Sequence, residues 1–335
     1  MGVHFGKKIK EIRKQNDLTQ LEFAGILGYK DKSMIAHIEK GETEMSNDKI
    51  ALLIKKFNVD ANELFVEKRN IGTNVAEAQS IDDFYDRYDE DARLKRRNGQ
   101  VEYLTTNTYI HKYLKRGDKI IELGAGTGAY SIPLAKEGYD VTSIELVEHN
   151  LDILKSKITD DMNIKAHRGN ALDLSRFPDE SFDITLVLGP MYHLFAEEDK
   201  VRCLQEAKRI TKKDGHIFVA YCMNEGSIIS YVFLADGLGE IRKKDLLTED
   251  WHCKSDPKEI FELVRIEDID EYNEKAGLNR IKIVATDGAS RYIKDRLDKM
   301  DDETFREWID YHIHICERGD LIGASHHSLD ILMKS

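Results

Sequence analysis

The sequence predicts an α/β domain built on a mainly parallel sheet, preceded by a small domain made only of helices. From residue 119 to residue 222, apolar runs of strand length alternate with helical patterns, which is typical of parallel strands covered by helices on both faces. Between residue 1 and about residue 67, apolar residues recur only at helical spacing. A chain of 335 residues is long enough for two such domains.

Composition excludes several classes of protein. The chain has 41% hydrophobic and 33% charged residues, as soluble globular proteins do, and no apolar run of about 18 residues that would span a membrane. Its four cysteines form no CxxC pair, so neither a zinc cage nor a disulfide framework is indicated. The first residues have no apolar signal segment. We therefore expect a cytoplasmic protein that has no membrane partner.

The net charge of −12 is unevenly distributed. Residues 1–69 contain 13 Lys and Arg against 11 Asp and Glu, whereas the remainder contains 37 against 51. The large domain is therefore a poor electrostatic match for a nucleic-acid backbone, while the N-terminal segment can still bind one.

The first 67 residues predict a series of short helices. Apolar spacing predicts a first helix from Phe5 to Gln15. Thr19 and Glu22 have the spacing of a capping box and so begin a second helix, which ends at Gly28. Further helices are expected at Ser33–Lys40, Asn47–Phe57 and Asn62–Phe65.

Two helices joined by a turn that contains glycine form a helix-turn-helix. The string LTQLEFAGILGYKDKSMIAHIEKGE resembles the Cro/C1-type (XRE) repressor domain. The resemblance implies operator DNA as a partner, usually for a homodimer, with Gln20 near a phosphate and Ile35 and Ile38 in the core. The residues it places in the major groove are Lys30, Lys32, Ser33, Met34 and His37. A dimerisation or docking module that does not bind DNA stays open, because the recognition helix has no arginine.

The two domains are expected to be joined by a linker at residues 68–80, which lacks a sustained apolar period. The large domain would then cover residues 81–335. It begins with a helical cap at residues 81–116, which consists of an aromatic and acidic helix from Ile81 to Tyr88 and a second helix over Val101–Leu114.

The strand Lys119–Leu123 leads directly into three glycines, at 124, 126 and 128. Glycine accepts a positive φ and lets a ligand approach the backbone closely. The spacing fits neither the dinucleotide pattern G-x-G-x-x-G nor the P-loop. The string from Glu122 to Gly128 resembles the E/D-x-G-x-G-x-G motif of class I S-adenosylmethionine (SAM) methyltransferases. An ordinary tight turn is the alternative.

A second strand, Asp140–Ile144, ends at an acidic residue, Glu145. Glu145 follows Gly124 by 21 positions, close to the ~20 that places an acid on a ribose in nucleotide-binding sheets. Because neighbouring parallel strands end at the same edge, this carboxylate is expected to lie beside the glycines and to accept hydrogen bonds from ribose hydroxyls.

The resemblance also implies a set of cofactor contacts. In this family an aspartate after the third strand, here Asn163–His167, meets the adenine amino group. Asn170 replaces it, and an amide oxygen can still accept that hydrogen bond, although Asn170 can instead be a turn residue. The predicted cofactor-binding residues are Glu122, Gly124, Ala125, Gly126, Thr127, Gly128, Glu145, Leu146, Asn170, Ala171 and Leu188.

The fourth strand, Phe182–Leu188, is followed by the sequence GPMYHL. Ligands bind at the carboxyl ends of such strands, so Tyr192 and His193 are the candidate catalytic residues, with His193 as a base. A histidine hydrogen-bonded to backbone at a helix start is the alternative. Tyr85, Tyr88, Tyr103 and Tyr109 of the cap either line the pocket or pack the cap on the sheet.

The remaining sequence predicts a lid and the last strands. His216–Cys222, after a turn at 213–215, is the fifth strand, Ser227–Leu238 a helix, and 242–257 a lid. Strands at 260–265 and 280–286, flanking the helix Ile269–Ala276, would complete a seven-stranded Rossmann-like sheet with an antiparallel edge hairpin, as the family has. The segment 302–334 is expected to be helical at both ends. An amphipathic helix explains His312, His314, Cys316, His326 and His327, so no metal site is predicted, and a metal site among them is the alternative.

Together these features indicate a SAM-dependent methyltransferase fused to a helix-turn-helix. The segment GPMY lacks the D/N/S-P-P-Y/F/W pattern of amino-directed DNA methyltransferases, and the chain has no Pro-Cys pair for cytosine-C5 methylation. A small-molecule acceptor is therefore expected, with S-adenosylhomocysteine as the second product. The main alternative is a transcriptional regulator that senses SAM with little or no turnover, and a weaker one is methylation of RNA or protein.

Overall fold

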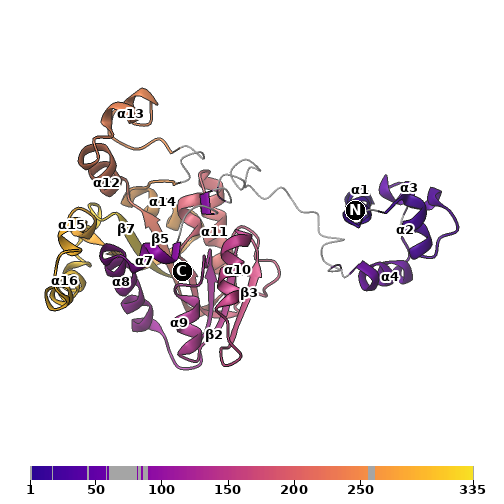
Figure 1. Ribbon diagram of the computed structural model, residues 1–335, viewed down its shortest axis with the longest axis horizontal. Helices are drawn as coiled ribbons and strands as arrows, with labels where there is room; N and C mark the ends of the chain where they lie inside the picture. The colour runs from indigo at the N-terminus through magenta and orange to yellow at the C-terminus, as the bar shows by residue number, and fades with distance from the viewer. Residues whose placement is uncertain are drawn as a thin grey trace. The chain divides into compact units, whose positions relative to one another are not determined.

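The computed structural model describes residues 2–16, 18–43, 45–57, 59, 81, 84–85, 90–255 and 261–334 (Figure 1). The chain divides into two compact units, Met1–Ile71 and Gly72–Ser335. The division falls inside the expected linker, whose residues lie outside the described part of the chain, as do the helix expected at 62–65 and Tyr88. Within the described residues, none of the helices is long and apolar enough to cross a membrane.

The N-terminal unit is a group of helices around a small apolar core. Its helices are α1 (Gly2–Gln15), α2 (Gln20–Ile26), α3 (Lys32–Glu39) and α4 (Asn47–Phe57). The predicted capping box is confirmed: the Thr19 hydroxyl accepts from the Glu22 amide, and the Glu22 carboxylate accepts from the Thr19 amide at 2.8 Å. Ile35 and Ile38 are fully buried, as expected, and they pack with Phe23 and Leu27.

The C-terminal unit contains a seven-stranded sheet in the order β3-β2-β1-β4-β5-β7-β6. Strands β1 to β5 are parallel, and β7 runs antiparallel to both β5 and β6. The predicted α/β class with a mostly parallel sheet is therefore confirmed. The strands are β1 (Lys119–Leu123), β2 (Asp140–Glu145), β3 (Ile164–Arg168), β4 (Phe182–Val187), β5 (Thr211–Cys222), β6 (Leu278–Ala285) and β7 (His327–Lys334).

Helices surround this sheet (Figure 1). Before and between the parallel strands lie α7 (Glu90–Lys95), α8 (Arg97–Tyr113), α9 (Ser131–Lys136), α10 (Glu148–Ser156), the 3₁₀ turn η1 (Pro190–His193) and α11 (Glu197–Ile210). After β5 come α12 (Asn224–Ser227), the π-helix η2 (Ile228–Leu234), α13 (Leu238–Lys243) and α14 (Ile266–Ala276). Between β6 and β7 come η4 (Gly288–Arg291), α15 (Lys294–Leu297), α16 (Asp302–Ile315) and α17 (Gly319–Ile322).

Of the last two predicted strands, the one at 280–286 is confirmed as β6, and the other is not. The strand expected at 260–265 is wrong, because its described residues make a single bridge, from Val264 to Met223. The helix expected at the end of the chain is also wrong, since His327–Lys334 is β7. Strand β7 is covered on both faces, so it lacks the alternation of a half-exposed strand. Its buried Asp330, paired with Arg280 at 2.7 Å, further masks the apolar run.

Two smaller expectations also need correction. The helix predicted at 227–238 is not one continuous α-helix. Ser227 is the last residue of α12, and the π-helix η2 then continues only to Leu234. The turn predicted at 213–215 lies inside β5, where the pairing with β4 moves from Thr211 directly to His216. A bulge in the strand, and not its start, therefore accounts for the polar residues there.

Candidate cofactor and acceptor site

The glycine loop after β1 needs glycine for two reasons. Gly124, Gly126 and Gly128 have φ values of +70°, +53° and +88°, in the left-handed region that disfavours side chains. A Cβ on Gly124 would also lie 2.8 Å from Cδ of Pro190, where the loop after β4 approaches. The loop backbone can therefore come close both to η1 and to a ligand at this edge of the sheet.

Glu145 ends β2 directly beside this loop. One of its carboxylate oxygens accepts a hydrogen bond from the Gly126 amide at 2.6 Å, and the other accepts from the Val147 amide at 2.8 Å. The side chain is buried. These two bonds fix the orientation of the carboxylate toward the glycine loop.

Glu122, at the end of β1, is a buried carboxyl group at the base of the cavity. The hydroxyl of Ser131 donates to it, and the hydroxyl of Ser143 donates to Ser131 at 2.7 Å. Burial raises the pKa of Glu122 to about 8; the bonds from Ser131 oppose this shift and the charge of Glu145 adds to it. A positively charged ligand group beside Glu122 would favour its ionised form.

These residues line one cavity with an empty volume of about 960 Å³, counting its open mouth. Every predicted cofactor residue except Gly128 lines it, and so do Tyr192 and His193. Gly128 lies behind the wall, where a Cβ would meet Ile132 at 2.9 Å. The sequence did not identify several other lining residues: Ile81, Arg93, Leu94, Ala129, Tyr130, Val147, Asn150, Gly169, Gly189, Pro190 and Leu194.

Asn170 makes the hydrogen bonds of a turn residue, its alternative role. Its side-chain oxygen accepts from the Leu172 amide at 2.9 Å, and its backbone carbonyl accepts from the Asp173 amide at 3.0 Å. The amide oxygen has a second lone pair, so an adenine contact remains a prediction. Ala171 beside it is buried and lines the cavity.

The two candidate catalytic residues lie on η1 with their polar atoms engaged. The Tyr192 hydroxyl donates to the Leu188 carbonyl at 2.8 Å, a bond that ties the turn to the end of β4, and a catalytic role of Tyr192 stays a prediction. Nε2 of His193 lies 2.9 Å from the Tyr85 hydroxyl, and the rings meet edge to face. Phe261 packs against the His193 ring, with centroids 5.4 Å apart. The histidine is therefore held by aromatic neighbours.

Of the other cap tyrosines, neither Tyr103 nor Tyr109 lines the cavity. Tyr109 is buried, with its hydroxyl donating to Glu317, and Tyr103 packs against Tyr130 with centroids 5.2 Å apart. The packing alternative therefore describes these two, while Tyr85 lies in the cavity wall.

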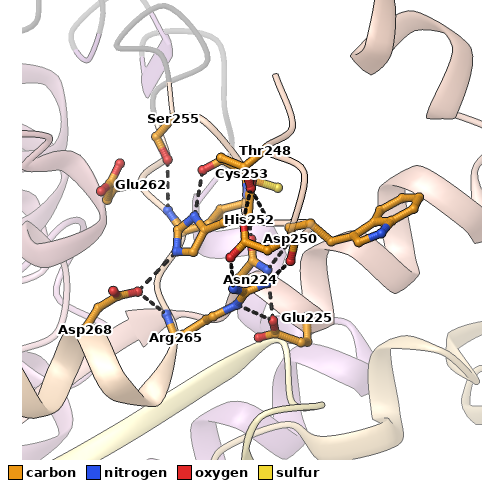
Figure 2. Close-up of polar contacts among 12 residues, drawn as sticks. Asn224, Glu225, Thr248, Asp250, His252, Cys253, Ser255, Glu262, Arg265 and Asp268 are labelled. Atoms are coloured by element: carbon orange, nitrogen blue, oxygen red, sulfur yellow. Dashed lines mark hydrogen bonds and ion pairs between the residues drawn. The ribbon is translucent and has the colours of Figure 1, made fainter. Parts of the chain in front are cut away.

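The segment predicted as a lid is fastened to its neighbours (Figure 2). Asn224 accepts from the Cys253 amide at 2.8 Å and donates to the Trp251 carbonyl at 3.0 Å. His252 contacts Asp268 of α14 at 3.2 Å, a contact that raises the pKa of His252. No described residue of 242–255 lines the cavity. This segment therefore braces α12 and α14, and its described part does not cover the site.

In the N-terminal unit, the residues predicted to contact DNA are exposed on α3 and the turn before it, except Gln20. The exposed set is Lys30, Lys32, Ser33, Met34 and His37. The side-chain amide of Gln20 donates to Glu39 at 2.8 Å, and Arg13 pairs with the same carboxylate at 2.6 Å. Gln20 thus contributes to a partly buried polar cluster that fixes α2 against α1 and α3.

Comparison with known proteins identifies both units. Residues 121–219 match a family model described as a methyltransferase domain, and residues 9–64 match one described as helix-turn-helix. An uncharacterised methyltransferase of Schizosaccharomyces pombe is 29% identical over 136 residues, which are 38% of this chain and 46% of that protein. The antitoxin PezA of Streptococcus pneumoniae is 41% identical over 64 residues, 19% of this chain and 40% of that protein.

Other relatives agree on the larger unit. The glycine/sarcosine N-methyltransferase of Aphanothece halophytica is 28% identical over 137 residues, 40% of this chain and 51% of that protein. The chain therefore spans about half, or less, of the curated relatives it matches. Among solved structures, the CcbJ methyltransferase of Streptomyces caelestis has a TM-score of 0.50 and 16% identity, covering 78% of this chain and 98% of that one. This likeness shows the shared fold.

Proposed function

We propose that this chain, which combines a SAM-dependent methyltransferase domain with a helix-turn-helix domain, transfers a methyl group from SAM to a small-molecule acceptor. One observation carries the proposal. A single cavity joins the glycine loop and Glu145 on one side with Tyr85, Tyr192 and His193 on the other. Cofactor and acceptor can therefore meet in one space.

The groups on the cofactor side fit SAM. The glycine backbone leaves room for close approach, Glu145 has acceptor capacity for the ribose hydroxyls, and buried Glu122 suits a nearby cationic group. Asn170 and Ala171 lie where the adenine would be held. When bound, SAM supplies an electrophilic methyl group on a sulfonium.

The chain's own contribution is mainly to position the acceptor. Holding two reactants in a near-attack arrangement can lower a barrier by about 7–11 kcal/mol. His193, oriented by the Tyr85 hydroxyl at 2.9 Å, would take a proton from an acceptor that must lose one. The aromatic rings of Tyr85, Tyr192 and Phe261 around it favour an acceptor with an apolar or cationic surface.

A small acceptor is favoured over a macromolecule. The relatives' names point both ways, since one is a glycine/sarcosine N-methyltransferase and another an eEF1A lysine and N-terminal methyltransferase homolog from Drosophila melanogaster. In this chain, residues 70–335 carry 37 basic against 51 acidic residues, which disfavours nucleic acid. The acceptor side of the cavity has the aromatic lining typical of a small-molecule site.

We further propose that the N-terminal unit binds DNA as a homodimer. The exposed face of α3 carries Lys32, Ser33, Met34 and His37, with Lys30 just before it, as a recognition helix requires. If the large domain had no turnover, the same arrangement would describe a regulator that senses SAM.

The test is transfer of labelled methyl from SAM into a fractionated lysate, with small molecules, protein and nucleic acid collected separately. Label in the small-molecule fraction that is lost in Glu145→Gln and kept in Glu148→Gln is the expected result. Glu148 is a matched control, since it lies on α10 in a surface pair with Arg168 at 2.9 Å. Label only in nucleic acid or protein contradicts the acceptor proposal, and SAM binding without any transfer supports the sensor.

A further inference from the structure

A second cluster of polar side chains lies at the carboxyl edge of the sheet, outside the cofactor cavity. Asp287 follows the end of β6, and His326 and His327 stand at the start of β7, where His327 pairs with Cys222 at the end of β5. One ligand atom from each of the three residues lies within 4.8 Å of the other two. We propose that Asp287, His326 and His327 bind a divalent transition-metal ion.

His326 gives the first reason. Only 6% of its surface is exposed, and neither ring nitrogen has a hydrogen-bond partner among the described residues. Leaving a buried polar atom without a partner costs about 1–3 kcal/mol. Native proteins rarely keep such atoms unless a water molecule or an ion satisfies them. The ring lies against that of His327, with centroids 4.9 Å apart, so it faces the rest of the cluster.

Asp287 gives the second reason, because its carboxylate is already oriented. Oδ1 accepts from the backbone amides of His326 and His327 at 2.9 and 3.1 Å, and from the Ser325 hydroxyl at 2.7 Å. Oδ2 faces Nδ1 of His327 at 3.0 Å, in a hydrogen bond whose proton a metal ion would displace. Two ligands about 2.1 Å from the same ion are about 3.0–3.4 Å apart when adjacent, so this pair has the required spacing.

A second carboxylate lies at the edge of the cluster. Glu102 of α8 lies 3.5 Å from Nδ1 of His327 and pairs with Arg93 at 2.7 Å. The carboxylates of Asp287 and Glu102 balance the guanidiniums of Arg93 and Arg291 when both histidines are neutral, so a dication would meet no excess of positive charge. Glu102 faces the same ring nitrogen as Asp287, so it stands beside the proposed ion. Arg93 lines the cofactor cavity, so one ion pair connects the two sites.

The ligand types decide which metal is expected. Two imidazoles and one carboxylate suit Zn²⁺, Fe²⁺, Co²⁺ or Mn²⁺, whereas Mg²⁺ and Ca²⁺ prefer oxygen ligands throughout. Three protein ligands leave at least one coordination position open, as in sites that bind a substrate or water. The competing explanation is an ordinary His327–Asp287 ion pair with a water molecule on His326.

Metal titration of the tag-free, full-length protein after chelator treatment separates the two explanations. Calorimetry with Zn²⁺ or Co²⁺ is expected to give one equivalent, and the X-ray absorption spectrum of the Co²⁺ form is expected to show two imidazole ligands. His326→Asn and Asp287→Asn should weaken binding at least about tenfold, which is the lower bound even for the outer partners of a metal. The control, His314→Asn, changes an exposed histidine on α16 and should bind as the wild type does.

Several results would overturn the proposal. One is a wild-type protein that binds less than one equivalent, and another is a Co²⁺ spectrum without imidazole scattering. Unchanged affinity in His326→Asn, or an equal loss in His314→Asn, would assign the metal to some other place. The absorption spectrum is measured on the wild type, so the proposal stays testable even if circular dichroism shows that a variant fails to fold.

Discussion

Replacing Glu145 by glutamine tests the cofactor side with almost no change in shape. In the wild type, both carboxylate oxygens are held by backbone amides, from Gly126 at 2.6 Å and Val147 at 2.8 Å. Glutamine removes the charge and leaves one acceptor oxygen. The hydroxyls of a bound ribose would lose charge-assisted hydrogen bonds that contribute about 1.5–3 kcal/mol each. We therefore expect the Kd for SAM to rise about 10- to 150-fold for one such bond.

The same substitution has a second effect that must be measured separately. One backbone amide of the pair would face the new NH₂ group, which costs about 1–3 kcal/mol of stability without any ligand. Calorimetric titration with SAM gives the Kd, and thermal denaturation without SAM gives the loss of stability. The control Glu148→Gln should change neither by much, because exposed ion pairs contribute about 0–1 kcal/mol. A Kd for Glu145→Gln within about twofold of the wild type would refute the assignment of Glu145 to the cofactor.

Three further predictions concern other parts of the molecule. The folded state raises the pKa of Glu122 from 4.5 to about 8, so between these values it binds more protons than the unfolded state, and wild-type stability should fall as pH rises. Chemical denaturation at several pH values should show this fall in the wild type and not in Glu122→Gln. Parallel curves of stability against pH for the two proteins would contradict the assignment. Tyr85→Phe removes the hydroxyl 2.9 Å from His193 and should lower kcat about tenfold with unchanged SAM affinity, whereas a loss of SAM affinity alone would make Tyr85 a cofactor contact. Alanine at Lys30 or Lys32 should make the slope of log K for DNA binding against log salt concentration shallower by about one for each phosphate that the lysine neutralises. Filter-binding titrations at several salt concentrations measure this slope, and an unchanged slope would exclude phosphate binding by that lysine.

Signals close together in the sequence were sufficient to predict the cofactor side of the cavity. The three glycines follow their strand directly, and Glu145 comes at the end of the next strand, which pairs with β1 from Lys119↔Asp140 onward. Parallel neighbours end at one edge, so the spacing in sequence becomes proximity in space. Arg93 lines the same cavity but was not predicted, because it arrives from α7, and no local pattern indicates which face of a short helix meets a distant loop.

The last strand of the sheet could not be predicted in the same way. Strand β7 pairs with β5 through Cys222↔His327 and with β6 through Ala285↔Ser328, so its partners lie 105 and 43 positions earlier in the chain. The apolar run of β7 is interrupted by Asp330. Arg280 of β6 pairs with this carboxylate, and Asn273 of α14 donates a hydrogen bond to it. These partners are recognisable only once the strands are adjacent, and so the sequence pattern indicated a helix.

This difference determines where the specificity of the proposed methyl transfer has to be sought. The cofactor half of the carboxyl edge consists of short-range elements, and its groups all suit one common ligand. On the other side, Tyr85 from the cap and His193 from η1 line the cavity, and Phe261 from the segment before α14 packs against the His193 ring. The cluster at the start of β7 is joined to this cavity by the Arg93–Glu102 pair. Since segments far apart in the chain supply these groups, an acceptor is better identified from them than from the glycine motif. Changing His193 or Phe261 should therefore alter the choice of acceptor, while the affinity for SAM stays near that of the wild type.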